Sequence, residues 1–126
     1  MKYITLLIIG LLLFGCVQDT HLKTVHFKVD MTAIDEVYKV GIRGPFTKNP
    51  WQDTIYFTDT DNDGIYEGTI TKQTAQSSVS FKFVNRDSIF ELEHQNNRQI
   101  NFKYQPETIQ YEAVFDKPLG KQSQMN

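Results

Sequence analysis

The sequence has one cysteine, Cys16, among its 126 residues. A single cysteine cannot form an internal disulfide, so a disulfide framework is excluded. The chain also lacks an excess of positive charge, because 13 Lys and Arg stand against 15 Asp and Glu, for a formal net charge of −2. Nucleic-acid binding requires a basic face, and this charge balance gives none.

No apolar run is long enough to cross a bilayer as a helix. The longest follows Lys2 and ends at Phe14, which is about a dozen residues where about 20 are needed. We therefore interpret residues 1–15 as a signal peptide. The run ends in Leu-Phe-Gly-Cys, which resembles a bacterial lipobox, and this favours lipidation of Cys16. The alternative is an ordinary secreted protein with a free thiol.

Catalytic and metal-binding signatures are missing as well. The three histidines are scattered without the spacing of a metal site, and no nucleophile-elbow or phosphate-loop motif occurs. Glu91 and Glu93 are two residues apart on one expected strand, so they should lie side by side rather than across a cleft as a glycosidase pair does. We interpret both carboxylates as solvated and expect no enzyme activity.

Alternating apolar and polar residues are the main positive signal. The alternation is clearest in residues 24–30 and 79–84, where Phe81 and Phe83 should face a core. In residues 37–43, Tyr38 should face inward. Further strands are expected at residues 54–58, 65–71, 88–93, 98–104 and 108–115. About eight short strands and no helical pattern predict an all-β fold, an antiparallel immunoglobulin-like β-sandwich.

The expected organisation has four parts. Residues 1–15 are the signal peptide and residues 16–22 a tether. Residues 23–115 form the β-sandwich domain, which is long enough to bury one core. Residues 116–126 are mostly polar and should be a flexible tail.

An acidic segment, Asp-Thr-Asp-Asn-Asp-Gly, lies between two expected strands. Its first residue, Asp59, together with Asp61 and Asp63, matches the front of a calcium loop, but Ile70 stands where the bidentate Glu of that loop is needed. We favour a hairpin turn in which the Asp side chains accept backbone N–H groups and Gly64 takes a positive φ. The three Asp residues stay weaker candidates for calcium, and no cofactor is expected.

Several short motifs occur in an order that resembles starch- and glycogen-binding modules, the family-20 and family-48 type of carbohydrate-binding domain. The resemblance covers about residues 24–103 and is closest to versions found on secreted or lipid-anchored proteins of Bacteroidota. The motifs are Phe-Lys-Val-Asp-Met at 27–31, Val-Gly-Ile-Arg-Gly at 40–44, Phe46, Trp51, the acidic turn through Gly68, Phe-Lys-Phe-Val-Asn at 81–85, Glu93 and Asn-Asn-Arg at 96–98.

The resemblance implies a starch-binding-domain-like fold with an α-glucan site. It implies that Trp51 stacks on a glucose ring, that Lys82 donates to sugar hydroxyls and that Phe90 is a second aromatic contact. Asn96 or Asn97 would supply a further polar contact. The residues alone fit other interpretations equally well or better: Trp51 as a cap on the sandwich, Lys82 as a solvated cation and Phe90 as a core residue.

We therefore expect a non-catalytic lipoprotein of the cell envelope, anchored to the outer membrane, whose β-sandwich binds an α-glucan. The alternative is an immunoglobulin-like module that docks with an envelope protein and binds no glycan.

Overall fold

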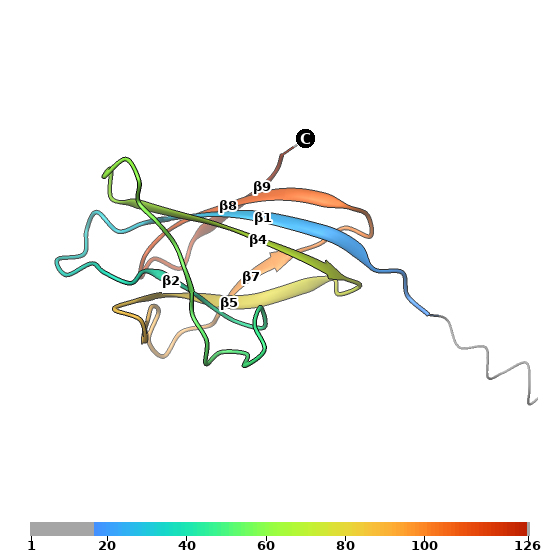
Figure 1. The fold of residues 1–126 in the computed structure, drawn as a ribbon, viewed down its shortest axis with the longest axis horizontal. Helices are drawn as coiled ribbons and strands as arrows, with labels where there is room; N and C mark the ends of the chain where they lie inside the picture. The colour runs from blue at the N-terminus through green and yellow to red at the C-terminus, as the bar shows by residue number, and fades with distance from the viewer. Residues whose placement is uncertain (1–16, 126) are drawn as a thin grey trace, which may run out of the picture.

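The computed structural model describes residues 17–125, which form nine strands in two sheets and contain no helix. The predicted all-β sandwich is confirmed (Figure 1). The predicted signal peptide and Cys16 lie outside the described residues. None of the described segments is a helix that could cross a membrane. The strands are β1 (His21–Asp30), β2 (Gly41–Arg43), β3 (Ile55–Tyr56), β4 (Ile65–Thr74), β5 (Ser78–Asn85), β6 (Ile89–Phe90), β7 (Arg98–Asn101), β8 (Glu107–Val114) and β9 (Gly120–Gln124).

The first sheet has the strand order β4-β1-β8-β9. β1 pairs antiparallel with β4 along all ten of its residues and parallel with β8. The sequence predicted antiparallel pairing throughout. A hairpin requires antiparallel strands, but β1 and β8 are joined by a chain that passes through both sheets, so no turn fixes their relative direction.

The second sheet has the order β3-β2-β5-β6, and β7 also pairs with β5. β6 and β7 run in the same direction against successive parts of β5, at residues 84–85 and 78–81. They therefore behave as one strand interrupted by the loop at residues 91–97. This loop leaves the sheet beside the strand that carries Lys82.

The core lies between the sheets and is rich in aromatic rings. Phe27, Phe81 and Phe83 have at most 1% of their surface exposed, which confirms the predicted inward faces of β1 and β5. Phe27 is central, because its ring lies within 6.3 Å of five other rings: Phe46, Phe57, Phe81, Phe83 and Tyr111. Aromatic pairs at such distances add to the stabilisation from buried apolar area.

The predicted flexible tail is wrong for residues 120–124, which form β9 and pair with β8. The strand reads Gly-Lys-Gln-Ser-Gln and none of its residues is buried, so hydrophobic alternation could not reveal it. Its backbone hydrogen bonds define it, and Gly120 leaves room for the Tyr111 side chain, because a Cβ there would come within 2.0 Å of the Tyr111 hydroxyl. The predicted tether is also too long, since β1 begins at His21.

Tyr38 was predicted to face inward, but 51% of its surface is exposed. β2 begins only at Gly41, and Lys39, between Tyr38 and the buried Val40, has φ of 47°. A positive φ breaks the pleat of an extended chain. The alternation therefore does not continue across Lys39, and Tyr38 turns outward.

Candidate ligand-binding face

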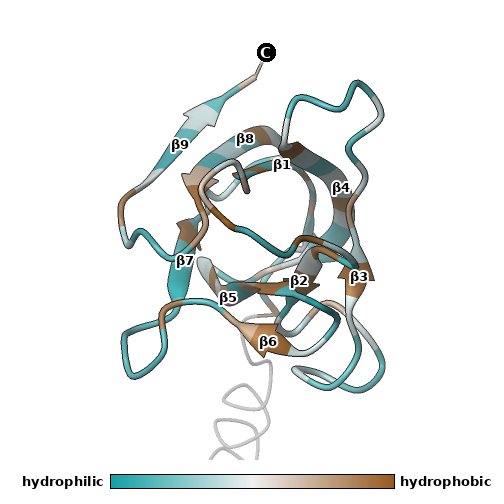
Figure 2. Ribbon diagram, turned by 90° about the vertical axis from the view of Figure 1, so that its left-hand side faces the viewer, coloured by the Kyte–Doolittle hydropathy of each residue, from teal (hydrophilic) through white to brown (hydrophobic). Residues whose placement is uncertain are grey.

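One row of residues crosses the second sheet on its outer face. Tyr56 is opposite Gly41, Gly41 is opposite Val84, and Val84 is opposite Phe90. Directly opposite residues point to the same side of a sheet, and the neighbouring row through Ile42 faces the core. The row therefore points away from the core. Figure 2 shows β2, β3, β5 and β6 together in one layer, with β3 and β6 coloured as hydrophobic.

Phe90 is on this outer face with 38% of its surface exposed, so its interpretation as a core residue is wrong. The next residue, Glu91, takes the inward position instead, where it is fully buried. Val84, opposite Phe90, is also fully buried but does not belong to the core between the sheets. Side chains on the outer face must therefore cover it, which makes this face a small second apolar cluster.

Trp51 joins Phe90 on this face. Its ring centroid is 6.5 Å from that of Phe90, and the two rings are tilted by 36°. Trp51 lies in the loop between β2 and β3, where its backbone N–H donates to the Gly44 carbonyl at 3.1 Å and its φ is 65°. A positive φ is unfavourable for a bulky residue. The loop thus holds the half-exposed indole in a specific place at some cost in backbone strain.

Arg43 is the residue of this face that sequence reasoning missed. Its guanidinium carbon is 5.5 Å from the centre of the Phe90 ring. Its Nε donates to Thr54 Oγ1 at 2.7 Å, and its Nη1 donates to the Trp51 carbonyl at 3.4 Å. A single Arg at a strand end is usually solvated, so only the folded chain reveals its place against the Phe90 ring and the Trp51 carbonyl.

Lys82 is directly opposite Arg43 in the sheet. Its Nζ donates to the carbonyls of Leu92 and Gln95 at 3.0 and 3.1 Å. Two of its three N–H donors are therefore used to hold the loop at residues 91–97, and one is left. Lys82 is therefore neither a fully solvated cation nor a side chain with all three donors free to bind a sugar.

Asn96 and Asn97 are exposed at the tip of that loop. They line a shallow hollow of about 400 Å³ together with Arg98 and Pro118, and neither Trp51 nor Phe90 is among its lining residues. The structure thus brings Trp51, Phe90 and Lys82 to one face, joined by Arg43. The two Asn residues belong to a neighbouring hollow.

Glu91 was predicted to be solvated, and that prediction is wrong. Its carboxylate accepts two hydrogen bonds of 2.7 Å from Arg98 and one of 2.8 Å from the Phe83 backbone N–H. Both side chains of the pair are at most 1% exposed. Sequence patterns assign charged residues to the surface because they are rarely buried unless paired. Glu93 is exposed, as predicted.

The acidic segment forms the predicted turn, but the predicted hairpin is wrong, because the segment joins β3 of the second sheet to β4 of the first and the flanking chain pairs only at the single bridge between Thr58 and Glu67. The Asp59 carboxylate accepts the backbone N–H groups of Asp63 and Gly64, at 3.2 and 2.9 Å, and Gly64 has φ of 82°. The three carboxylates converge, with one oxygen from each within 4.8 Å of the others. The pKa of Asp61 is raised, chiefly by its hydrogen bond with Asp59 and to a smaller extent by desolvation and by the neighbouring Asp63 carboxylate. The turn's own hydrogen bonds position Asp59 and also Asp63, whose carboxylate accepts the Ile65 N–H at 2.9 Å.

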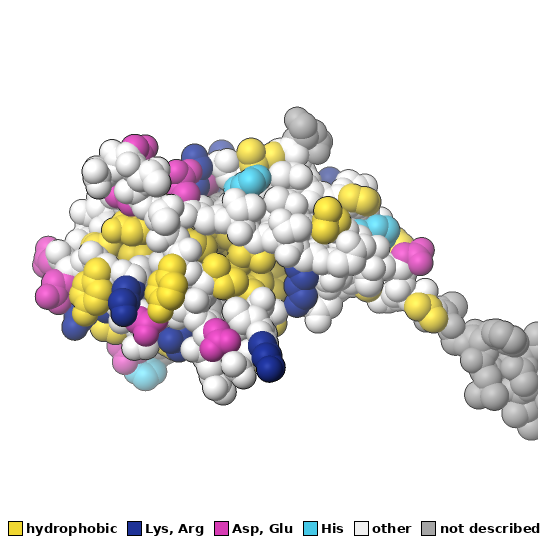
Figure 3. Space-filling model, in the orientation of Figure 1, with side chains coloured by type: hydrophobic (Ala, Val, Ile, Leu, Met, Phe, Trp, Pro, Cys, Tyr) yellow, Lys and Arg dark blue, Asp and Glu magenta, His cyan; other side chains and the backbone are white. Residues whose placement is uncertain are grey.

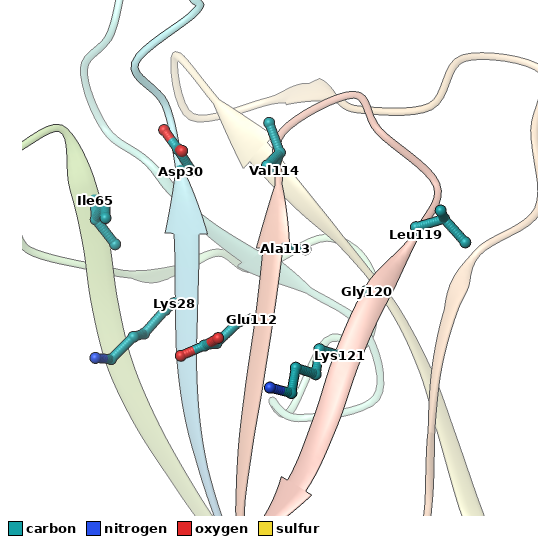
Figure 4. A pocket seen from close by; sticks show the side chains of 9 residues that line it. All are labelled: Lys28, Asp30, Ile65, Glu112, Ala113, Val114, Leu119, Gly120 and Lys121. Carbon is teal, nitrogen blue, oxygen red and sulfur yellow. The ribbon is translucent and has the colours of Figure 1, made fainter.

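We call the outer face of the second sheet that carries Trp51, Phe90, Arg43 and Lys82 the aromatic face. Two other hollows differ from it in kind. On the outer side of the first sheet, Lys28, Glu112 and Lys121 lie next to one another on three strands around a depression of about 490 Å³ (Figure 4). Their charges alternate across the strands, and Glu67, opposite Lys28 on β4, completes two positive and two negative charges. Figure 3 shows apolar side chains gathered between the two sheets; the crevice there, which Phe46 and Phe102 help to line, holds only about 20 Å³, room for about one water molecule.

The comparisons with known proteins give no identification: no protein-family model and no curated protein matches the chain.

Proposed function

We propose that this protein is a non-catalytic, lipid-anchored carbohydrate-binding protein of the cell envelope. Its ligand would stack on Trp51 and Phe90. The observation that carries the proposal is the pairing of these two partly exposed rings, 6.5 Å apart, on the outer face of one sheet. Both residues are those that the resemblance to starch-binding modules assigns to sugar contact.

The chemistry of the face suits a saccharide. The C–H groups of a pyranose ring form an apolar surface that packs on an aromatic ring, and hydroxyls at the ring edge need hydrogen-bond donors and acceptors. Arg43 supplies donors beside the rings, and the remaining donor of Lys82 lies on the neighbouring strand. The resemblance implies an α-glucan as the saccharide. For such an open face we expect weak binding, with Kd on the order of 0.1–1 mM.

Trp51→Ala tests the proposal. Loss of about 80 Å² of stacked apolar surface removes about 2 kcal/mol, or roughly thirtyfold in Kd. Calorimetry or affinity electrophoresis with maltoheptaose and glycogen measures this change. Phe90→Ala should weaken binding in the same direction. Tyr104→Ala is the matched control, because Tyr104 is 63% exposed and lies in the connection between β7 and β8, away from this face.

Melting curves of each variant separate a lost contact from a lost fold. If the wild-type protein binds no saccharide, or if Trp51→Ala binds as well as wild type, the proposal fails. If Trp51→Ala unfolds the domain, Trp51 is a structural residue and Phe90→Ala alone decides the matter.

A docking role with an envelope protein is the second candidate. It is favoured by the exposure of Tyr38 and Tyr56, at 51% and 53%, since tyrosine is enriched in protein interfaces. Tyr38→Ala should then abolish a stoichiometric complex with a purified envelope partner and leave saccharide binding unchanged. A complex that survives Tyr38→Ala and Tyr56→Ala would reject this candidate.

A further inference from the structure

We infer that the aromatic face takes an acidic oligosaccharide, in which a uronic acid carboxylate binds Arg43 while the sugar rings stack on Trp51 and Phe90. This inference rests on the proposed stacking function and specifies its ligand further. It predicts that a neutral glucan is bound less tightly than a comparable saccharide that carries carboxylates.

The first observation is that two cations are placed directly opposite each other. Arg43 on β2 is the register partner of Lys82 on β5. Like charges directly opposite each other in a sheet destabilise it. Lys82 relieves part of this repulsion through two carbonyl groups, but carbonyls do not neutralise its charge. Nothing within the sheet makes this opposition of two cations favourable, whereas an anion bound between or beside them would stabilise it.

The second observation is that neither cation has a carboxylate partner. Within residues 17–125, five residue pairs have a side-chain nitrogen of Lys, Arg or His within 4.0 Å of a carboxylate oxygen, and Arg43 and Lys82 take part in none of them. The two nearby acids are engaged elsewhere. Asp87 accepts a hydrogen bond from the Tyr56 hydroxyl, and Asp53 accepts one from Asn49. Arg43 and Lys82 therefore each lack a carboxylate within 4.0 Å, and both are left without a direct ion-pair partner.

The outer face of the first sheet provides a contrast within the same molecule. There, Lys28 and Lys121 flank Glu112 in the register, and Lys28 also lies 3.4 Å from Glu67 (Figure 4). Its cations thus alternate with carboxylates across the strands. It is the aromatic face that combines stacking rings with unpaired cations.

The third observation is the way in which Arg43 is held. Nε and Nη1 are turned to Thr54 and to the Trp51 carbonyl, and the guanidinium lies against the Phe90 ring. Its Nη2 takes part in neither bond. A guanidinium fixed in this way loses little rotamer entropy when it binds an anion, and it forms stronger hydrogen bonds to a carboxylate than to a hydroxyl. The carboxylate of a uronic acid projects from the edge of the sugar ring, where a group beside the stacked ring would meet it.

The experiment compares one saccharide in two charge states: an oligogalacturonate and its methyl ester, which has the same rings without the negative charge. Calorimetry with the full chain in detergent should show that the free acid binds about five- to tenfold more tightly than the ester at low salt. The difference should shrink at 1 M NaCl, where the Debye length is about 3 Å. Arg43→Gln should remove the difference, so that this variant binds the acid and the ester with equal affinity.

Two further variants support the interpretation. Arg43→Lys retains the charge without the planar fork and should keep part of the preference, which guards against a general loss of structure in Arg43→Gln. Lys121→Gln removes an exposed cation from the opposite sheet and should have no effect. Trp51→Ala should weaken the acid and the ester equally.

Equal affinity for acid and ester, or a preference that persists in Arg43→Gln, would overturn the inference and leave the proposed stacking function intact. Tight binding of tetraglutamate would also overturn it, since the face would then recognise charge without a saccharide. If the acid, the ester and maltoheptaose all fail to bind, the proposed function falls, and the inference falls with it.

Discussion

The pair of Glu91 and Arg98 shows how much of this fold depends on single buried charges. Arg98 donates to Glu91 through Nε and Nη2, and Nη2 also reaches the carbonyls of Val114 and Lys117. Glu91 accepts the backbone N–H of Asp116 at 3.2 Å as well. One ion pair thus ties the edge of the second sheet to the turn between β8 and β9 of the first.

Glu91→Ala should destabilise the domain by about 3–5 kcal/mol, because it leaves the Arg98 charge buried without a partner. Urea unfolding followed by Trp51 fluorescence measures the change. Glu93→Ala is a matched control two residues away, since Glu93 is exposed and its loss should change stability by no more than about 0.5 kcal/mol. Equal effects of the two substitutions would mean that the buried pair contributes nothing to stability.

A second buried pair, Lys23 and Glu107, makes stability depend on pH. Burial alone would raise the pKa of Glu107, but hydrogen bonds from Lys23, Gln124 and the Lys103 backbone outweigh it and lower the pKa. A carboxyl whose pKa is lower in the folded state stabilises the fold above its unfolded pKa, and this contribution is lost as the pH falls through the folded pKa.

The melting temperature should therefore fall as the pH drops below about 5. Glu107→Gln should be less stable than wild type at neutral pH and should lose less on acidification. Glu67→Gln, which changes a half-exposed partner of Lys28, should keep the wild-type pH profile. A Glu107→Gln profile parallel to that of wild type would show that other groups cause the acid sensitivity.

At the scale of whole elements, β9 offers the clearest test of the fold. It forms the edge of the first sheet and covers β8 through five register pairs, Ile109 to Ala113 against Gly120 to Gln124. Removing residues 120–126 should expose the edge of β8, where unpaired backbone groups favour aggregation. We expect a loss of about 2–4 kcal/mol, from several backbone hydrogen bonds at about 1 kcal/mol each. Thermal unfolding of the truncated chain gives the measurement.

An unchanged melting temperature of the truncated chain would show that residues 120–126 do not stabilise the domain, and would favour the predicted flexible tail. Hydrogen exchange on the intact protein checks the same point without a deletion. Amides of β8 that face β9 should be protected about as well as those that face β1.

The elements that could be predicted from the sequence are those whose side chains alternate between core and solvent. β1 and β5 are of this kind, and Phe81 and Phe83 lie where alternation places them. β9 could not be found in this way, because an edge strand with no buried residue is held by backbone bonds alone. The predicted inward orientation of Tyr38 was wrong because the positive φ of Lys39 interrupts the alternation of the strand.

The candidate site was predictable in its parts and not in its assembly. Trp51 and Phe90 were identified by resemblance, but they lie in different loops and strands, and only the fold places their rings together. The role of Arg43 depends on its register with Lys82, which the sequence does not encode locally. Asn96 and Asn97 were assigned by order along the chain, and the loop carries them into a neighbouring hollow.

At the scale of the whole molecule, strand directions place the aromatic face relative to the N-terminus. β1 begins at the end of the sandwich where the chain enters (Figure 1). β4 is antiparallel to β1 and so ends there, and β5 begins there after a short turn. Val84 and its partner Phe90 are near the other end of β5. The rings therefore lie toward the end of the sandwich that is far from residue 17.

This arrangement gives the predicted lipid anchor a geometric consequence. Residues 17–20 separate Cys16 from the start of β1 at His21, and an extended chain of this length reaches only about 17 Å. A domain anchored through Cys16 would stand close to the bilayer with the start of β1 facing the lipid. The aromatic face would then lie toward the outer end, where a polysaccharide can reach it.

Cys16→Ser should release the protein from the membrane fraction or leave it unprocessed, because the substitution removes the sulfur that would carry the lipid. Cell fractionation with radiolabelled palmitate measures both effects. Several acyl chains hold a protein stably at a membrane, whereas one chain binds only marginally, so the wild-type protein should resist extraction by high salt and require detergent. A Cys16→Ser protein that is processed and fractionates like wild type would reject the anchor. The short distance from the bilayer to the sandwich would then no longer orient the aromatic face.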